Sequence, residues 1–224
     1  MAQPIHILLD TPLPGIRRIT LNRPEKRNAL NNRLRAEIFA ALEAHDRDEE
    51  VKVTIIRAAG PAFCAGYDLS ANNRVEQPYH TAGGHGQWSR HVVDGWFRVW
   101  DLAKPVIAQV HGYCLAGGTE AVAKGWANRA FAAADLDTEV LKIAERVAKI
   151  PSDIQQINKR SVHRAMEIMG LRAAVRSGTE IQALAFHTDS SKAYMSRFRR
   201  DGESVSKLLS ERDASFGDYR ERKK

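Results

Sequence analysis

A glutamate shortly after a pair of glycines is the arrangement in this chain best suited to chemistry. Gly117 and Gly118 carry no Cβ, so they let the backbone approach a ligand closely at the end of an apolar run over 106–110. Glu120 falls just inside an expected helix start, where free N–H groups and the positive end of the helix dipole face the same place. Backbone donors beside a carboxylate can hold an oxyanion while a proton moves.

A second glycine motif occupies residues 62–69, directly after an expected strand. Gly66 again permits close backbone approach, and the N–H of Tyr67 could point into the same site as the N–H of Gly117. Two backbone donors that converge on one oxygen form an oxyanion hole. Removing one donor from such a site typically lowers the rate by about 10²–10³.

The elements that must position these motifs alternate between strand and helix in the first half of the chain. Apolar and β-branched residues predict strands, and apolar spacing with a period near 3.6 predicts helices. The second half reads as almost entirely helical, so the expected fold class is α/β with a helical C-terminal region. We expect strands at 16–21, 51–56 and 105–110, and helices at 28–45, 91–102, 137–149, 152–169, 171–187 and 189–213.

Composition favours a soluble globular protein, because 43% of the 224 residues are hydrophobic and 27% are charged. No apolar stretch approaches the ~18 residues that a membrane span needs, and residues 1–15 do not resemble a signal peptide. Cys64 and Cys114 have no metal-type or redox-type spacing, which suits a reducing cytosol. We therefore expect a cytoplasmic protein with no membrane partner.

The net charge of +7 arises mainly in the C-terminal half, notably at 197–200 and 220–224. A solvated helical surface with a frayed tail is the favoured interpretation, and a polyanionic small molecule is the next. Nucleic acid is not expected, because no aromatic-and-basic recognition pattern accompanies the charge. His80, His85 and His91 suggest a metal site less than they suggest a polar loop, so no metal is expected.

Three segments together resemble the signatures of the enoyl-CoA hydratase/isomerase family, also called the crotonase superfamily. They are residues 22–30 (NRPEKRNAL), 63–69 (FCAGYDL) and 104–120 (KPVIAQVHGYCLAGGTE). In this order and spacing they are specific. The resemblance implies a crotonase-like spiral of ββα turns over 1–136 and a helical oligomerisation region over 137–224. It also implies a coenzyme A thioester substrate, no further cofactor, and a homotrimer or a dimer of trimers.

The family's functional residues transfer to individual positions of this sequence. Tyr67 and Gly117 match the two oxyanion-hole residues, and Glu120 matches the first of two acid–base glutamates. The resemblance also implies contacts to coenzyme A from four further positions, which are Lys26, Ala65, Asp68 and Leu69.

The sequence departs from the family pattern directly after Glu120. The family continues with a long helix, further strands and the second glutamate before a stretch similar to residues 121–129, whereas here the two flanks abut. Either the chain has lost this segment, or the complete protein contains further residues between Glu120 and Ala121. Loss of core strands would be hard for a marginally stable domain to survive, so we favour the second explanation.

The expected activity is that of an enoyl-CoA hydratase, which adds water across the 2,3 double bond of an enoyl-CoA through an oxyanion hole and glutamate acid–base catalysis. A second hypothesis keeps the family but changes the reaction to that of an isomerase, dehalogenase, decarboxylase or synthase. A third hypothesis, of a different class, is a non-catalytic acyl-CoA-binding paralogue.

Overall fold

The computed structural model describes residues 4–69, 87–115 and 128–196, together with four single helical residues near the C-terminus, which are Lys207, Ser210, Glu211 and Ala214. Several expected features lie outside the described residues: Gly117, Gly118 and Glu120, the junction after Glu120, and the loop histidines His80 and His85.

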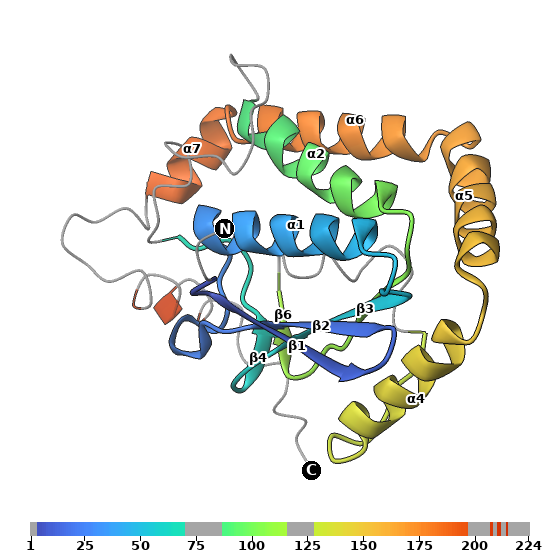
Figure 1. Cartoon of the computed structure of the whole chain (residues 1–224). Coiled ribbons are helices and arrows are strands. Elements are labelled where there is room, and N and C mark those ends of the chain that lie inside the picture. The colour runs from blue at the N-terminus through green and yellow to red at the C-terminus, as the bar shows by residue number, and fades with distance from the viewer. Residues whose placement is uncertain are drawn as a thin grey trace, which may run out of the picture.

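A four-stranded mixed sheet forms the centre of the described structure (Figure 1). Strand β1 (Ile7–Leu13) runs antiparallel to β2 (Ile16–Leu21), and β2 runs parallel to β3 (Val53–Ala58), which runs parallel to β5 (Val106–Ala108). The structure confirms the three expected strands, with β3 shifted by two residues. It adds β1, which the sequence analysis did not anticipate.

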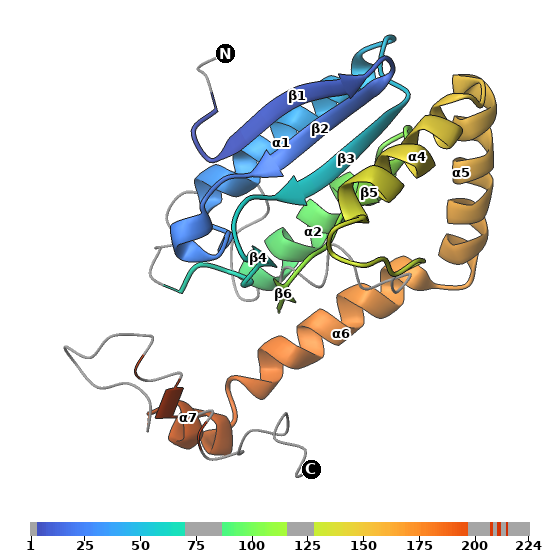
Figure 2. The same ribbon diagram turned by 90° about the horizontal axis from the view of Figure 1, so that it is seen from below.

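Helices cover both faces of this sheet (Figures 1 and 2). Helices α1 (Asn32–Arg47) and α2 (Gln87–Asp101) lie on one face, and α4 (Leu136–Ala148) packs on the other. Strand β3 serves both faces, because alternate side chains point to opposite sides of a strand. Val53 and Ile55 pack with α4, whereas Ile56 packs with the cluster under α1.

An asparagine caps the start of α1. Asn31 is the N-cap, and its side-chain oxygen accepts a hydrogen bond of 2.8 Å from the backbone N–H of Leu34. The helix therefore begins at Asn32, four residues later than the apolar spacing indicated. Asn28 has a different role, described with the site below.

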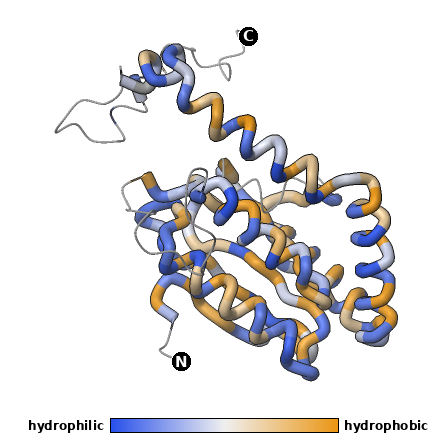
Figure 3. Tube along the Cα trace, turned by 90° about the horizontal axis from the view of Figure 1, so that it is seen from above, coloured by the Kyte–Doolittle hydropathy of each residue, from blue (hydrophilic) through white to orange (hydrophobic). Residues whose placement is uncertain are grey.

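The rest of the described chain is helical, as expected: α5 (Ser152–Ile168), α6 (Leu171–Ala185) and α7 (Asp189–Ser196). Together with the sheet this confirms the α/β class with a helical C-terminal region. No helix among the described residues is long and apolar enough to cross a membrane. Apolar residues nevertheless recur along the surface of α5 and α6 (Figure 3), including Ile157, Val162, Ile168, Ile181 and Leu184, all exposed.

The expected boundary at 136/137 coincides with the beginning of α4. Val140 and Ala144 of α4 are buried against Ile16, Val53 and Ile55 of the sheet. Asp137 also accepts hydrogen bonds from Arg57 at 2.9 Å and Gln109 at 3.1 Å. In packing, α4 is thus part of the sheet unit, and the division into a spiral region and a separate oligomerisation region stays a prediction.

Candidate functional site

A short parallel strand pair brings the second and third sequence motifs together. Strand β4 (Ala62–Cys64) pairs with β6 (Tyr113–Cys114), and the backbone N–H of Leu115 donates to the carbonyl of Cys64 at 2.9 Å. Because parallel strands run in the same direction, both motifs leave the pair at the same end. Tyr67 follows Cys64 by three residues, and Gly117 follows Leu115 by two.

Gly112 makes this close pairing possible. Its φ is 58°, and a Cβ built there would lie only 2.1 Å from the carbonyl oxygen of Pro61. Any other residue would collide with that backbone. The imidazole Nε2 of His111 lies 2.8 Å from the carbonyl oxygen of Gly60, and the carbonyl of His111 accepts from the N–H of Phe63 at 3.0 Å.

The peptide of Tyr67 is held in a defined direction by a parallel bridge to Leu30. The N–H of Leu30 donates to the carbonyl of Gly66 at 2.7 Å, and the N–H of Asp68 donates to the carbonyl of Leu30 at 3.0 Å. In a parallel bridge, the residue between the two bonded peptides, here Tyr67, directs its own N–H and C=O away from the partner residue. The N–H of Tyr67 therefore points away from Leu30, after a turn in which Gly66 has a φ of 94°.

Asp68 is tied into the interior by an ion pair. Its Oδ2 lies 3.0 Å from Nη2 of Arg23, and the two side chains are 6% and 9% exposed respectively. The carboxylate of Asp68 is therefore engaged with Arg23, and the expected coenzyme A contact at Asp68 stays a prediction. Arg23 also donates to the carbonyl of Ala29, so the pair connects the first and second motifs.

Asn28 is a site-supporting residue whose role the sequence analysis missed. It is fully buried and has a φ of 55°, a left-handed conformation that asparagine tolerates better than most residues. Its Oδ1 accepts from the N–H of Arg23 at 2.8 Å, and its Nδ2 donates to the carbonyls of Ala59 and Ala62, both at 2.9 Å. Asn28 thus joins the first motif to the segment that leads into β4.

The other expected coenzyme A contacts lie at the surface near this junction. Lys26 ends the short 3-10 helix η1 (Pro24–Lys26) and is exposed. The N–H of Ala65 donates to the carbonyl of Arg27 at 3.0 Å, so Ala65 contacts the residue that directly follows Lys26. Leu69 is 65% exposed. Lys26 and Leu69 are thus accessible to a ligand, and Ala65 is partly exposed.

The ring of Trp88 and the buried cation of Arg35 contact the side chain of Tyr67. Its ring meets that of Trp88 edge-on at 5.4 Å, and the Arg35 guanidinium lies 5.7 Å and 5.4 Å from the two ring centres. His91 stacks on Trp88, and burial, assisted by the charge of Arg35, lowers the pKa of His91 to about 4. His91 is therefore a buried, neutral residue of α2, in agreement with the helix expected over 91–102 and not with its grouping among the histidines of a polar loop.

The described residues contain no cluster of side chains suited to a metal ion. Cys64 is buried, and burial raises the pKa of its thiol to about 11. A thiol with such a pKa stays protonated near neutral pH and is a poor nucleophile. Cys64 is thus a core residue, and Cys114 packs against the same core while half-buried.

Comparison with known proteins identifies the family. Residues 13–123 match the family model for enoyl-CoA hydratase/isomerase. An enoyl-CoA hydratase/isomerase from Xanthobacter autotrophicus Py2 has 30% identity and a TM-score of 0.78, and the match covers 96% of this chain and 99% of that one. The chain belongs to the enoyl-CoA hydratase/isomerase family. The crotonase fold expected from the three signatures is confirmed.

Two curated relatives of this family member differ in how far they align. Mevalonyl-coenzyme A hydratase sidH of Aspergillus fumigatus is 39% identical over 116 residues, which are 52% of this chain and 41% of sidH. EchA13 of Mycobacterium tuberculosis is 28% identical over 240 residues, which cover 74% of this chain and 76% of EchA13. The chain thus spans less than half the length of sidH.

The alignment with EchA13 bears on the departure after Glu120. It is longer, at 240 residues, than the whole chain of 224, although it uses only 74% of that chain. EchA13 therefore has residues that this sequence lacks. The family-model match ends at residue 123, close to the point where the family pattern breaks.

Proposed function

We propose that this family member acts on acyl-CoA thioesters and that its reaction is the hydration of an enoyl-CoA across the 2,3 double bond. The observation that carries the proposal is the β4–β6 pair, which sends the Tyr67 and Gly117 motifs out in the same direction. The N–H of Tyr67 points away from Leu30, as a donor to a bound ligand must.

Each residue has a distinct role in this proposal. The N–H groups of Tyr67 and Gly117 hold the thioester oxygen as it becomes an enolate, and Glu120 handles the proton. Hydration also needs a second carboxylate, which the family places in the segment that follows Glu120. Lys26, Ala65 and Leu69, with the backbone of Asp68, contact coenzyme A. No metal or redox cofactor takes part in this chemistry.

The test is hydration of crotonyl-CoA by the complete protein, including any residues between Glu120 and Ala121, and by its Glu120→Gln variant. The substitution keeps the size of the side chain and removes its acid–base capacity, so we expect turnover to fall by at least about a hundredfold. Glu145→Gln, on the exposed side of α4, is the matched control and should retain full activity. Near-normal turnover of the Glu120 variant removes this residue from the mechanism.

The family name includes isomerases, so a double-bond isomerase is the second candidate. The oxyanion donors are common to both reactions, and the number and position of acid–base groups separate them. A panel of 2-enoyl and 3-enoyl thioesters decides between them, because an isomerase interconverts the two series without adding water. Tight thioester binding without turnover of any member of the panel supports the non-catalytic paralogue instead.

We also propose that the chain assembles into a homotrimer or a dimer of trimers. The support is the exposed apolar surface of α5 and α6, where Ile168, Ile181 and Leu184 are each more than half exposed. Several large apolar side chains exposed on neighbouring helices are typical of a protein–protein contact. Light scattering after gel filtration gives the mass, and Ile181→Glu with Leu184→Glu should shift it to that of the monomer.

A further inference from the structure

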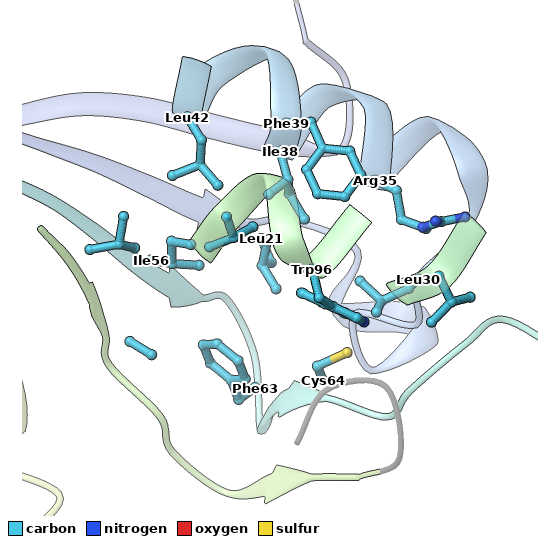
Figure 4. A pocket seen from close by; sticks show the side chains of 14 residues that line it. Leu21, Leu30, Arg35, Ile38, Phe39, Leu42, Ile56, Phe63, Cys64 and Trp96 are labelled. Atoms are coloured by element: carbon cyan, nitrogen blue, oxygen red, sulfur yellow. The ribbon is translucent and has the colours of Figure 1, made fainter. Parts of the chain in front are cut away.

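Two of the hollows in the described part of the chain differ in the groups that line them. The first, between the sheet and helices α1 and α2, is lined almost entirely by apolar side chains such as Phe63 and Trp96 (Figure 4). The second lies between the end of α2 and α5, and its volume is about 670 Å³. Charged and polar side chains line it together with apolar ones, and one of them is the primary amine of Lys159.

The amine of Lys159 is held between two backbone carbonyls. Its Nζ donates to the carbonyl oxygens of Leu102 and Lys104, the second at 3.0 Å, in the loop between α2 and β5. An amine that has lost its extra proton keeps two N–H groups, which suffice for both carbonyls. Its lone pair then takes the remaining tetrahedral direction, away from them. The two carbonyls therefore accommodate the neutral, nucleophilic form of the amine.

The carboxylates whose charges reach Lys159 are engaged with other partners. Asp46 of α1 accepts from the backbone N–H of Lys104 at 2.8 Å, and Asp101 of α2 accepts from Arg172 of α6. Burial lowers the pKa of Lys159 to about 8, and the charges of Asp46 and Asp101 oppose this effect without cancelling it. Near pH 8 about half of the amine is thus neutral.

The hollow also has room for a molecule beside the amine. Its volume falls in the range of pockets that hold small molecules and cofactors. The rings of Trp100 and His163 lie on its wall and stack with 3.7 Å between their centres, and burial lowers the pKa of His163. The other charged residues of the lining are Asp101, Asp153, Arg160, Arg164, Glu167 and Arg172.

We propose that Lys159 is a modification site whose amine takes the acyl group of an acyl-CoA thioester. The Nζ lone pair attacks the thioester carbonyl carbon, a C–N bond forms, and the C–S bond breaks. The sulfur of coenzyme A leaves with the electron pair of that bond and takes up the proton that the amine releases. The products are an amide on Lys159 and free coenzyme A. Because an amide nitrogen keeps a single N–H, acylation also removes one of the two hydrogen bonds to the α2–β5 loop.

The test treats the complete protein with acetyl-CoA and follows each lysine by peptide mass spectrometry. The exposed Lys149 is the comparison within the same sample. At pH 7.5 Lys159 should react at least about fivefold faster, because its neutral amine is roughly two hundred times more abundant than that of an ordinary lysine and its lower basicity cancels only part of this gain. A rate at Lys159 no higher than that at Lys149 overturns the proposal.

The pH dependence of the same reaction is a second measurement. From pH 7 to 9.5 the rate at Lys159 should level off above about pH 8, where its amine is already neutral, whereas the rate at Lys149 should keep rising. A rate at Lys159 that rises in parallel with that at Lys149 contradicts the assignment.

Two tryptophan substitutions on α5 test whether the acyl group arrives through the hollow. Ile157 lines the hollow, so Ile157→Trp narrows it and should lower the rate at Lys159 to that at Lys149 or below. Ile154→Trp, at another exposed position of α5, is the matched control and should react like the wild type. Both positions are exposed, so the larger side chain is compatible with folding. Equal rates at Lys159 in the two variants overturn the proposal.

The outcomes separate this inference from the proposed function, with which it shares acyl-CoA but no residue. Glu120→Gln should be acetylated at Lys159 at the wild-type rate. If crotonyl-CoA is hydrated and Lys159 stays unmodified, the modification site is wrong and the proposed function stands. If Lys159 is acetylated and no enoyl-CoA is hydrated, the proposed function fails alone.

Discussion

Arg23 Nη2 lies 3.0 Å from Asp68 Oδ2, and both side chains are almost completely buried. This ion pair joins the first sequence motif to the second across 45 residues of chain. Its carboxylate comes directly after Tyr67, so the pair fixes the backbone that carries the proposed oxyanion donor. The direction of the Tyr67 N–H thus depends on a buried charge pair beside it.

Removing one member of this pair should be strongly destabilising. Asp68→Leu leaves the guanidinium of Arg23 buried without its counter-ion, which typically costs about 3–5 kcal/mol of unfolding free energy. The double variant Arg23→Met/Asp68→Leu should recover much of that loss, because no buried charge remains. Urea denaturation of Arg23→Met, Asp68→Leu and the double variant measures this coupling, and purely additive losses would show that the pair is not coupled.

Asn28→Asp should destabilise the fold although it hardly changes the shape of the side chain. The amide Nδ2 donates to two backbone carbonyls, and a carboxylate oxygen would face both without a proton to give. Buried acceptors left without donors cost about 1–3 kcal/mol each, so we expect a loss of at least about 2 kcal/mol. Chemical denaturation at neutral pH provides the measurement. Asn32→Asp, at the half-exposed first residue of α1, is the control.

His91 should make the protein sensitive to mild acid. Burial lowers the pKa of His91 to about 4 from 6.5. Between pH 4 and pH 6.5 this histidine is therefore protonated in the unfolded chain and neutral in the folded chain. The unfolding free energy should therefore decrease as pH falls from about 6.5 to about 4, through this residue. His91→Leu should lack this component, whereas His187→Leu, at an exposed position, should keep it. Identical pH profiles for the wild type and His91→Leu would contradict the assignment.

Lys159 should produce the corresponding effect on the alkaline side. Its Nζ donates to the carbonyls of Leu102 and Lys104 at the end of α2, and burial lowers its pKa to about 8. Between that pKa and the ordinary value of 10.5, the unfolded state binds the extra proton, so stability through Lys159 should rise with pH. Thermal melts from pH 7 to 10 should show this rise in the wild type and in Lys149→Met. Lys159→Met should lack it.

The sequence predicted the main helices and the parallel strands because their apolar patterns are long and regular. It predicted the family because three signatures stand in the right order, and the β4–β6 pair brings the described parts of the second and third signatures side by side. Strand β1 was missed because apolar and polar residues do not alternate along it. Both faces of the strand are exposed in part, and the consecutive residues Leu8 and Leu9 are both about half exposed.

The supporting residues of the site were less predictable. The interactions of Asn28 and Arg23 join segments that are far apart in the sequence, and nothing in their local pattern distinguishes a buried amide or guanidinium from an exposed one. Lys104 illustrates the same limit. It stands at the beginning of the third signature, and its Nζ donates to the carbonyls of His45 and Asp48 at the end of α1.

The packing of α4 on the sheet has a consequence for partial unfolding and proteolysis of the chain. Ala144 and Val140 are buried on β2 and β3, whereas α5 has Gln155 as its one buried residue. A protease that cuts near Pro151 would therefore leave α4 with the sheet, while α5 and α6 stay attached through polar contacts to α2, such as Arg172 with Asp101 and Arg176 with Asp94. A cut before Leu136 that removed α4 would expose the apolar face of the sheet that Val140 and Ala144 cover. The boundary between separately unfolding parts of this chain lies after α4, and unfolding of the helices beyond it should need less free energy than global unfolding.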